Sequence, residues 1–208
     1  MGSSERRTAL AGWIAAAFLT LPAALGLAGC GGRGEAPRNL VVDRVEAQRT
    51  APLNPSSMSL AVGGAFAARQ SAYADNLSPA LTWAATPGAQ TYAVIIEDPD
   101  ARGATTFTHW LIWNIPGEAV GLPEGVPQGQ SPPAPAGALQ GLTDANTYGY
   151  FGPHPPPGTG LHHYHIELFA LDAPLPLKAT NRLPALEHAL QGHVLAKGDL
   201  VATYVGPR

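Results

Sequence analysis

Glycine and proline interrupt this chain at short intervals, and this feature limits the folds it can adopt more than any other. The 208 residues include 24 glycines and 21 prolines, two residue types that end helices and strands and favour turns. Long helices have little room in such a chain, and a β-rich fold with many turns is expected. The length suits one domain with an additional tail.

The first thirty residues have the pattern of an export signal that ends in a lipid attachment site. The basic pair Arg6-Arg7 precedes an uncharged stretch over residues 8–28, and Leu27-Ala28-Gly29-Cys30 closes it. Small residues after an apolar segment are typical of signal-peptidase cleavage. A cysteine directly after Leu-Ala-Gly resembles the lipobox of bacterial lipoproteins. The sequence therefore predicts a signal peptide over residues 1–29, acylation of Cys30 with chains such as palmitate, and a lipid-anchored location in the bacterial cell envelope.

Two alternatives remain open for this segment, which is just long enough to be an uncleaved transmembrane helix. The pair Arg6-Arg7 could also belong to a twin-arginine export signal. Cys30 is the only cysteine, so an internal disulfide and a thiolate metal cluster are excluded. The net charge of −3, without a basic stripe, argues against binding to nucleic acid.

Composition divides the rest of the chain into a predicted flexible tether over residues 30–56 and one folded domain over residues 57–208. Within the domain, apolar runs rich in β-branched residues predict strands, and a leucine-bearing segment with an early proline and a following glycine predicts a helix. A long loop rich in proline and glycine is expected at 116–147. The predicted strands are 91–97, 108–115 and 164–171, with shorter candidates at 58–62, 81–83 and 200–204, and the predicted helix is 182–191.

Residues capable of chemistry gather at the ends of these strands. Asp98 and Asp100 flank Pro99 directly after the first strand, where the fixed proline φ favours a turn. His109 lies near the start of the second strand, and strict alternation places it on the face of Leu111, Trp113 and Ile115. Taken separately, the first group is an ordinary turn and the second an ordinary core histidine.

A third group lies in the glycine- and proline-rich segment 148–158 and in His162-His163-Tyr164-His165. Such a loop can leave backbone N–H groups unpaired, which then form an anion-binding nest. Alternation directs His162 and Tyr164 to the inner face of the third strand and His163, His165 and Glu167 to the other. The second set has the residue types of a metal site, but polar residues on an outer face are more often simply solvated.

Motifs of the common enzyme classes are absent. The chain has no Gly-x-Ser-x-Gly elbow, no phosphate-binding Walker loop and no dinucleotide fingerprint. The sequence therefore predicts no cofactor, no metal and no catalytic activity.

The order of these groups resembles the phosphatidylethanolamine-binding protein family, in particular its bacterial Raf-kinase-inhibitor-like branch. Each motif is weak alone, but together they cover about residues 58–204. The matching pieces are Asn76-Leu77-Ser78-Pro79-Ala80-Leu81-Thr82-Trp83, Ile96-Glu97-Asp98-Pro99-Asp100-Ala101, His109-Trp110, Asn114-Ile115-Pro116, Gly149-Tyr150-Phe151-Gly152-Pro153, Pro155-Pro156, His162-His163-Tyr164 and Phe169-Ala170-Leu171-Asp172.

The resemblance implies an antiparallel β-sandwich with a small pocket at one end that accepts phosphate-like anions or phospholipid head groups. The family's pocket residues correspond to Asp98, Asp100, His109, Gly152, Pro153, His162 and Tyr164. A head group that carries both an amine and a phosphate suits two carboxylates and two imidazoles together. Arg102 replaces the usual proline after Asp-Pro-Asp-Ala, and His163 replaces a common arginine.

The leading expectation is therefore a non-catalytic envelope lipoprotein that binds a small anion or head group, with regulation of a partner protein as an additional role. One alternative is an envelope hydrolase that uses His109 and His162 as acid and base, with Asp98 orienting one of them. Another is an inhibitor of an envelope protease that presents the 116–147 loop. Homodimerisation is also compatible with the sequence.

Overall fold

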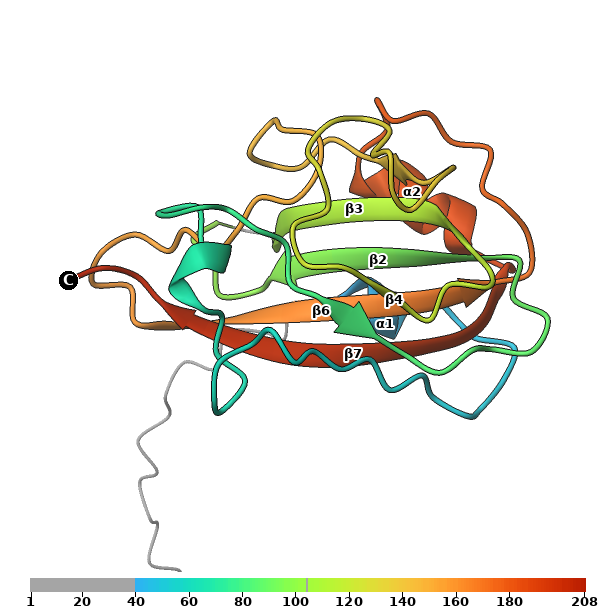
Figure 1. Cartoon of the computed structure of the whole chain (residues 1–208), viewed down its shortest axis with the longest axis horizontal. Helices are drawn as coiled ribbons and strands as arrows, with labels where there is room; N and C mark the ends of the chain where they lie inside the picture. Colours follow the sequence, from blue (N-terminus) through green and yellow to red (C-terminus); the bar gives the residue numbers. More distant parts are fainter. Residues whose placement is uncertain (1–39, 104) are drawn as a thin grey trace, which may run out of the picture. The chain divides into compact units, whose positions relative to one another are not determined.

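The computed structural model describes residues 40–103 and 105–208, and its centre is a five-stranded antiparallel sheet (Figure 1). The strands follow the spatial order β5-β3-β2-β6-β7, and each neighbouring pair is antiparallel. The three main predicted strands are all present, and the third begins three residues earlier than expected. The strands are β2 (Thr91–Asp98), β3 (Phe107–Pro116), β5 (Leu139–Gln140), β6 (Leu161–Leu171) and β7 (Val194–Val205).

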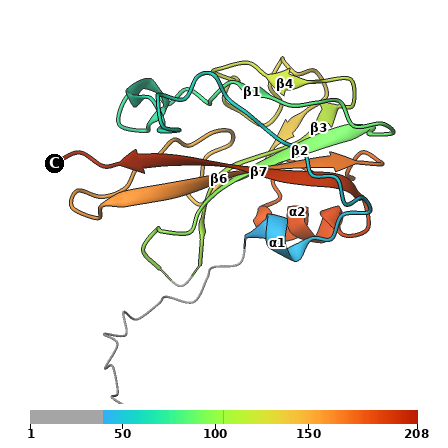
Figure 2. The same ribbon diagram turned by 90° about the horizontal axis from the view of Figure 1, so that it is seen from below.

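Alternation along the strands divides the core into two layers, one on each face of this sheet. Val94 and Ile96 belong to the first hydrophobic cluster, whereas Ala93 and Ile95 belong to the second. Figure 2 shows β1 (Leu81–Thr82) and β4 (Gly121–Leu122) on one side of the sheet, and α1 (Val41–Arg44) and α2 (Leu183–Leu190) on the other. A single 3₁₀ turn, η1 (Ala68–Gln70), lies in the loop before β1. The predicted all-β class with minor helix is confirmed, although the second sheet has only two residues in each strand.

The predicted C-terminal helix forms as α2, one residue shorter at each end. Pro184 occupies its first turn, and Leu186 and Leu190 are fully buried against the sheet. Gly192 follows with a positive φ of 81°, a conformation that favours glycine at a helix end. The short strand predicted at 58–62 is absent, since this segment consists of bends and a turn before Gly63 and Gly64.

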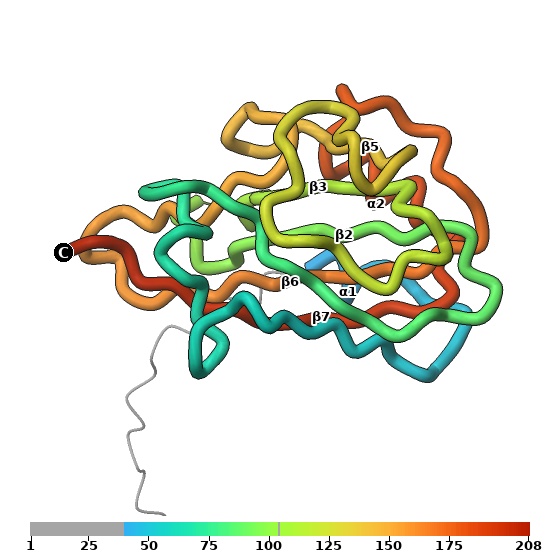
Figure 3. The backbone as a smooth tube through the Cα atoms, viewed as in Figure 1, coloured from blue at the N-terminus to red at the C-terminus, as the bar shows by residue number. Residues whose placement is uncertain are grey.

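The long connection between β3 and β6 folds onto the sheet (Figure 3). Gln140 of β5 fixes it from inside, because its side chain accepts from the Trp110 indole at 2.7 Å and donates to the carbonyls of Pro127 and Gly129 at 2.9 and 2.8 Å. Gln140 is fully buried, and a buried amide with its partners satisfied specifies one arrangement of the surrounding loop.

The structure contradicts the predicted boundary between tether and domain, since residues 40–56 pack against the sheet. Val41 and Val45 are completely buried in the second hydrophobic cluster, beside Leu186 and Leu190 of α2. The sequence reasoning failed because Leu40-Val41-Val42 is too short an apolar run to predict burial within a charged, proline-containing segment.

After α1 the same segment covers the outer edge of β7. The backbone N–H groups of Gln48, Arg49 and Leu53 donate to carbonyls of β7 at distances between 2.8 and 3.0 Å. A Cβ at Gly198 would lie 1.9 Å from the Leu53 carbonyl oxygen, so glycine is required there for this close approach. An edge covered in this way cannot pair with the strand of another molecule.

The predicted signal peptide, Arg6-Arg7 and Cys30 lie outside the described residues. Within residues 40–103 and 105–208, no helix combines the length and apolar character needed to cross a bilayer.

Candidate functional site

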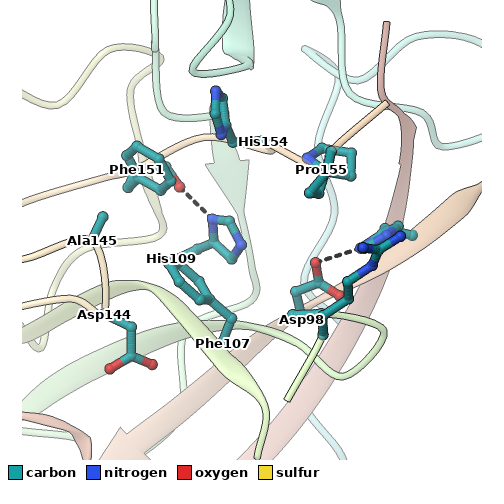
Figure 4. Close-up of a pocket in the computed structure, with 12 residues that line it drawn as sticks. Asp98, Phe107, His109, Asp144, Ala145, Phe151, His154 and Pro155 are labelled. Carbon is teal, nitrogen blue, oxygen red and sulfur yellow. Dashed lines mark hydrogen bonds and ion pairs between the residues drawn. The ribbon is translucent and has the colours of Figure 1, made fainter. Parts of the chain in front are cut away.

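A cavity of about 350 Å³ opens where β2 ends and β3 and β6 begin (Figure 4). It collects side chains from the turn after β2, from the loop after β5 and from the proline-rich loop before β6. The lining residues are Asp98, Ala101, Arg102, Phe107, His109, Asp144, Ala145, Phe151, His154, Pro155, Pro156 and His162.

A buried carboxylate–imidazole pair, Asp98 and His162, forms one wall of the cavity. The His162 Nδ1 and Asp98 Oδ2 atoms are 2.8 Å apart, and both side chains are less than 5 % exposed, at 3 % and 4 %. The other oxygen of Asp98 accepts from the backbone N–H of Asp100 at 2.8 Å. The second ring nitrogen of His162 lies 3.0 Å from the Thr159 hydroxyl. Both nitrogens therefore have partners within the protein, and His162 can donate to a ligand only after giving one up.

His109 reaches the cavity because of a bulge in β3. Ile96 pairs with Trp110 and Glu97 with Thr108, so His109 is an extra residue without a partner on β2. A bulge interrupts alternation and turns a side chain to the other face. The expectation that His109 shares a face with Leu111 and Trp113 is therefore wrong, since those residues lie in the second cluster and His109 faces Tyr164 of the first.

Hydrogen bonding and burial fix the protonation of His109. Its Nδ1 lies 2.7 Å from the Phe151 carbonyl oxygen; because a carbonyl only accepts, Nδ1 carries the proton. Burial lowers the pKa of His109 to about 4, against the opposing effects of the Phe151 carbonyl and the Asp98 charge. At neutral pH the ring is uncharged, and its Nε2 carries a lone pair that is able to accept a hydrogen bond.

Aromatic rings enclose the imidazole of His109. The ring of Phe107 lies 4.8 Å from it, Phe151 stacks at 5.7 Å, and Tyr164 meets it edge-on at 5.1 Å. The Tyr164 hydroxyl is buried without a hydrogen-bond partner in the described part of the chain. Burial and the charge of Asp98 raise the pKa of Tyr164, so the hydroxyl keeps its proton and remains a donor.

Residues of the surrounding loops complete the cavity. Arg102 is exposed in the turn after β2 and contributes a cation. The His154 ring stacks on Tyr73 with centroids 4.1 Å apart, which holds the imidazole in place. Asp144 accepts from the Thr108 backbone N–H at 2.8 Å and thereby joins the long loop to β3.

Four predicted site residues are absent from the cavity lining. Tyr164 contacts the His109 ring edge-on but does not line the cavity. The Asp100 carboxylate accepts from the backbone N–H of His163 at 2.8 Å and lies 2.7 Å from its ring Nδ1, so it holds the turn after β2 against β6.

Gly152 and Pro153 fasten the proline-rich loop to residues 70–76. The N–H of Gly152 donates to Asn76 Oδ1 at 2.7 Å, and the Pro153 carbonyl accepts from Ala72 at 3.1 Å. A Cβ at Gly152 would lie 2.1 Å from the Gln70 carbonyl oxygen. Glycine is therefore needed here for close packing, and its N–H is not part of the predicted anion-binding nest.

The metal alternative fails on geometry within the part of the chain that the structure describes. His163 and His165 lie on the opposite face from His162, as alternation predicts, but each imidazole is hydrogen-bonded to a carboxylate, Asp100 or Asp199. Glu167 is fully buried, and its Oε2 accepts from the Val42 N–H at 2.8 Å. In the described residues, no group of three His, Cys, Asp or Glu side chains is placed to hold a metal ion.

Several cavity residues escaped the sequence reasoning. Phe107 precedes the predicted strand by one residue, and Asp144 and Ala145 lie in the 116–147 loop, where no local pattern marks a site. Phe151, His154 and the two prolines belong to a segment that was singled out for its backbone rather than its side chains. These residues meet at one cavity because loop contacts join segments that are far apart in the sequence.

Comparison with known proteins agrees with this architecture. The sequence profile of the phosphatidylethanolamine-binding protein family matches residues 56–205. The protein UPF0098 PH1269 of Pyrococcus horikoshii is 45 % identical over 111 residues, which cover 53 % of this chain and 55 % of that protein. A Mycobacterium tuberculosis protein named as the lipoprotein LppC is 33 % identical over 99 % of this chain and 100 % of its own length.

A solved structure extends the likeness to three dimensions. The crystal structure of Escherichia coli YbcL, described as a member of the mammalian PEBP family, superposes with a TM-score of 0.68 at 27 % identity. The superposition covers 74 % of this chain and 98 % of YbcL. With its sheet, its terminal cavity and the profile match over most of its length, the chain belongs to the phosphatidylethanolamine-binding protein family.

Proposed function

We propose that the cavity binds a small phosphate-type ligand that also carries a proton donor, either phosphoethanolamine, as a lipid head group or free, or a protonated phosphate. The observation that carries this proposal is the mixture of groups around the cavity. The Asp98 carboxylate and the lone pair on His109 accept hydrogen bonds, whereas Arg102 provides a cation. A ligand with an anionic part and a protonated part satisfies both sets.

A simple anion without a proton fits less well at neutral pH. It would face the charge of Asp98 and the lone pair of His109, and both repel it. Protonation of His109 removes one of these obstacles, because a cationic imidazole donates from both nitrogens. Binding of inorganic phosphate should therefore be linked to the uptake of a proton and should strengthen as the pH falls toward the pKa of His109, about 4.

The ligand panel that tests this proposal consists of O-phosphoethanolamine, inorganic phosphate and ethanolamine, titrated calorimetrically into the domain at neutral pH. We expect phosphoethanolamine to bind most tightly. Asp98→Asn removes the anion that faces the ammonium and should weaken its binding about tenfold or more, since a charge-assisted hydrogen bond contributes about 1.5–3 kcal/mol. His165→Ala, on the opposite face of β6, is the matched control and should leave affinity unchanged. Affinities for phosphoethanolamine and for phosphate that Asp98→Asn leaves unchanged would contradict the proposal.

A hydrolase is the second candidate, and one observation favours it. The Thr159 hydroxyl, His162 and Asp98 form a relay with distances of 3.0 and 2.8 Å, which is the logic of a nucleophile, base and orienting carboxylate. However, the Thr159 hydroxyl also lies 2.8 Å from the Pro156 carbonyl, to which it donates, and Thr159 does not line the cavity. Turnover of chromogenic esters that disappears in Thr159→Ala would establish this activity; the binding proposal expects no turnover.

We also propose that Cys30 is acylated and anchors the domain to a membrane. The motif Leu27-Ala28-Gly29-Cys30 supports this, as does alignment along nearly the whole chain with a relative that bears a lipoprotein name.

A further inference from the structure

Three aliphatic side chains stand exposed together on the α1 side of the sheet, at the end that holds the cavity. Leu161 of β6 is 52 % exposed, and Val201 and Val205 of β7 are 42 % and 57 % exposed. The register places Leu161 beside Val205 and His165 beside Val201, with the pair His163 and Thr203 between them, so the three aliphatic side chains lie on one strip that a polar pair interrupts. Lys197 shares this face by alternation, and its ammonium donates to the carbonyls of Val42 and Val45 around α1.

The first described residues lie next to this strip. The backbone N–H of Val41 donates to Glu97 at 3.1 Å, and Glu97 pairs with His165, the neighbour of Val201. Leu40 therefore enters the domain beside the strip, on the same face. Ten peptide steps separate it from Cys30, and a chain of that length spans at most about 35 Å. The predicted tether to residue 56 would have allowed more than twice that reach.

Charge around the strip is mixed. The carboxylates of Asp100 and Asp199 are each hydrogen-bonded to an imidazole, His163 and His165, and the charges of Asp43 and Glu97 also act on His165. Although burial opposes it, the hydrogen bond to Asp199 raises the pKa of His165, which favours its cationic form. The sequence between Cys30 and Leu40 adds two arginines and one glutamate.

We infer that the strip of Leu161, Val201 and Val205 is the surface with which the lipid-anchored domain rests on the bilayer. The inference depends on the proposed acylation of Cys30. The apolar area of the strip is too small to hold a free protein on a membrane. It is sufficient for an anchored domain, because a short anchor raises the effective concentration of the bilayer at this face. His162 lies between Leu161 and His163 on β6 but points to the opposite face, so the docked strip brings the cavity end of the sheet to head-group level.

The full lipidated chain on vesicles of phosphatidylethanolamine and phosphatidylglycerol tests this surface. An environment-sensitive fluorophore is attached at Val205→Cys and, as an independent second position, at Leu161→Cys; acylated Cys30 does not react with it. Val120→Cys is the matched control, since Val120 is 55 % exposed and its carbonyl accepts from Trp83, next to β1 on the other layer. Vesicles should shift the emission at positions 205 and 161 to the blue, and brominated lipid should quench at least about half of it, with little change at position 120.

The remaining outcomes separate this inference from the proposals on which it rests. If the lipidated protein floats with vesicles but all three probes stay exposed to water, the strip is not the docking surface, whereas acylation of Cys30 still stands. If the mass of the protein shows no lipid, both the acylation of Cys30 and the docking surface are wrong. If the fluorophore at position 205 becomes shielded from water without vesicles, and more so as the protein concentration rises, the strip binds a second copy of the chain. That result would contradict docking on the bilayer. Phosphoethanolamine binding is measured on the soluble domain and does not depend on any of these results.

Discussion

Truncation of Val41 and Val45 to alanine should destabilise the domain as strongly as a substitution in a central strand. Both side chains are completely buried between α1, α2 and the sheet. Each substitution removes two methyl groups from a packed core, at about 0.8 kcal/mol for each group plus a term for the cavity left behind, or about 2 kcal/mol in all. The double variant should therefore lose about 4 kcal/mol, a large part of the 5–15 kcal/mol by which domains are usually stable.

Urea unfolding of a protein that begins at Asn39 measures this loss as a lower midpoint with an unchanged slope. Val62→Ala is the control, because Val62 is completely exposed in a turn, and it should change stability by less than about 0.5 kcal/mol. If residues 40–45 were part of a solvated tether, the double variant would resemble Val62→Ala. A loss below about 1 kcal/mol would therefore refute the packing of α1 as part of the core.

Three further predictions concern other parts of the chain. Cys30→Ser should abolish the mass of the acylated form; a protein that keeps this mass would contradict the lipobox assignment. Burial, together with Glu97, raises the pKa of Glu167 above its usual value. The folded state therefore holds a proton that the unfolded chain releases above about pH 4.3. The free energy of unfolding should fall as the pH rises further. Glu167→Gln should flatten that decline in urea titrations and exposed Glu46→Gln should not; equal pH slopes would show that Glu167 is ionised in the fold. Gly152→Ala should lower the unfolding free energy by about 1–3 kcal/mol, because its Cβ would meet the Gln70 carbonyl, and an unchanged melting temperature would contradict that close approach.

Sequence patterns predicted the centre of the sheet well because β2 and most of β3 are buried on both faces. The apolar run over residues 91–97 forms β2 almost as expected, and alternation along β6 directs His162 inward and His163 outward. What alternation could not predict was the bulge at His109, which depends on the register between β2 and β3 rather than on local composition.

The site was predicted only in part. Asp98, His109 and His162 lie at strand ends and were assigned through the family resemblance, whereas Asp144 reaches the cavity through a loop whose path depends on Gln140. Composition also misled at residues 40–56, because two buried valines and a few backbone hydrogen bonds are enough to order a segment that looks solvated. Gly152 was predicted to be a pocket residue, but in the structure it packs closely against the Gln70 carbonyl and does not line the cavity.

The protonation of the His109 ring, with and without ligand, tests the proposed binding site most directly. Long-range ¹H–¹⁵N spectra of the histidine rings report the protonation of each nitrogen as a function of pH. In the free domain we predict a proton on Nδ1, a lone pair on Nε2 and titration near a pKa of about 4. Saturating phosphate or phosphoethanolamine should shift the Nε2 resonance, and phosphate should raise this pKa, because a nearby anion stabilises the imidazolium form. His109 resonances and a pKa that stay the same when either ligand is bound would show that the ligand does not occupy this cavity and would contradict the proposed binding site.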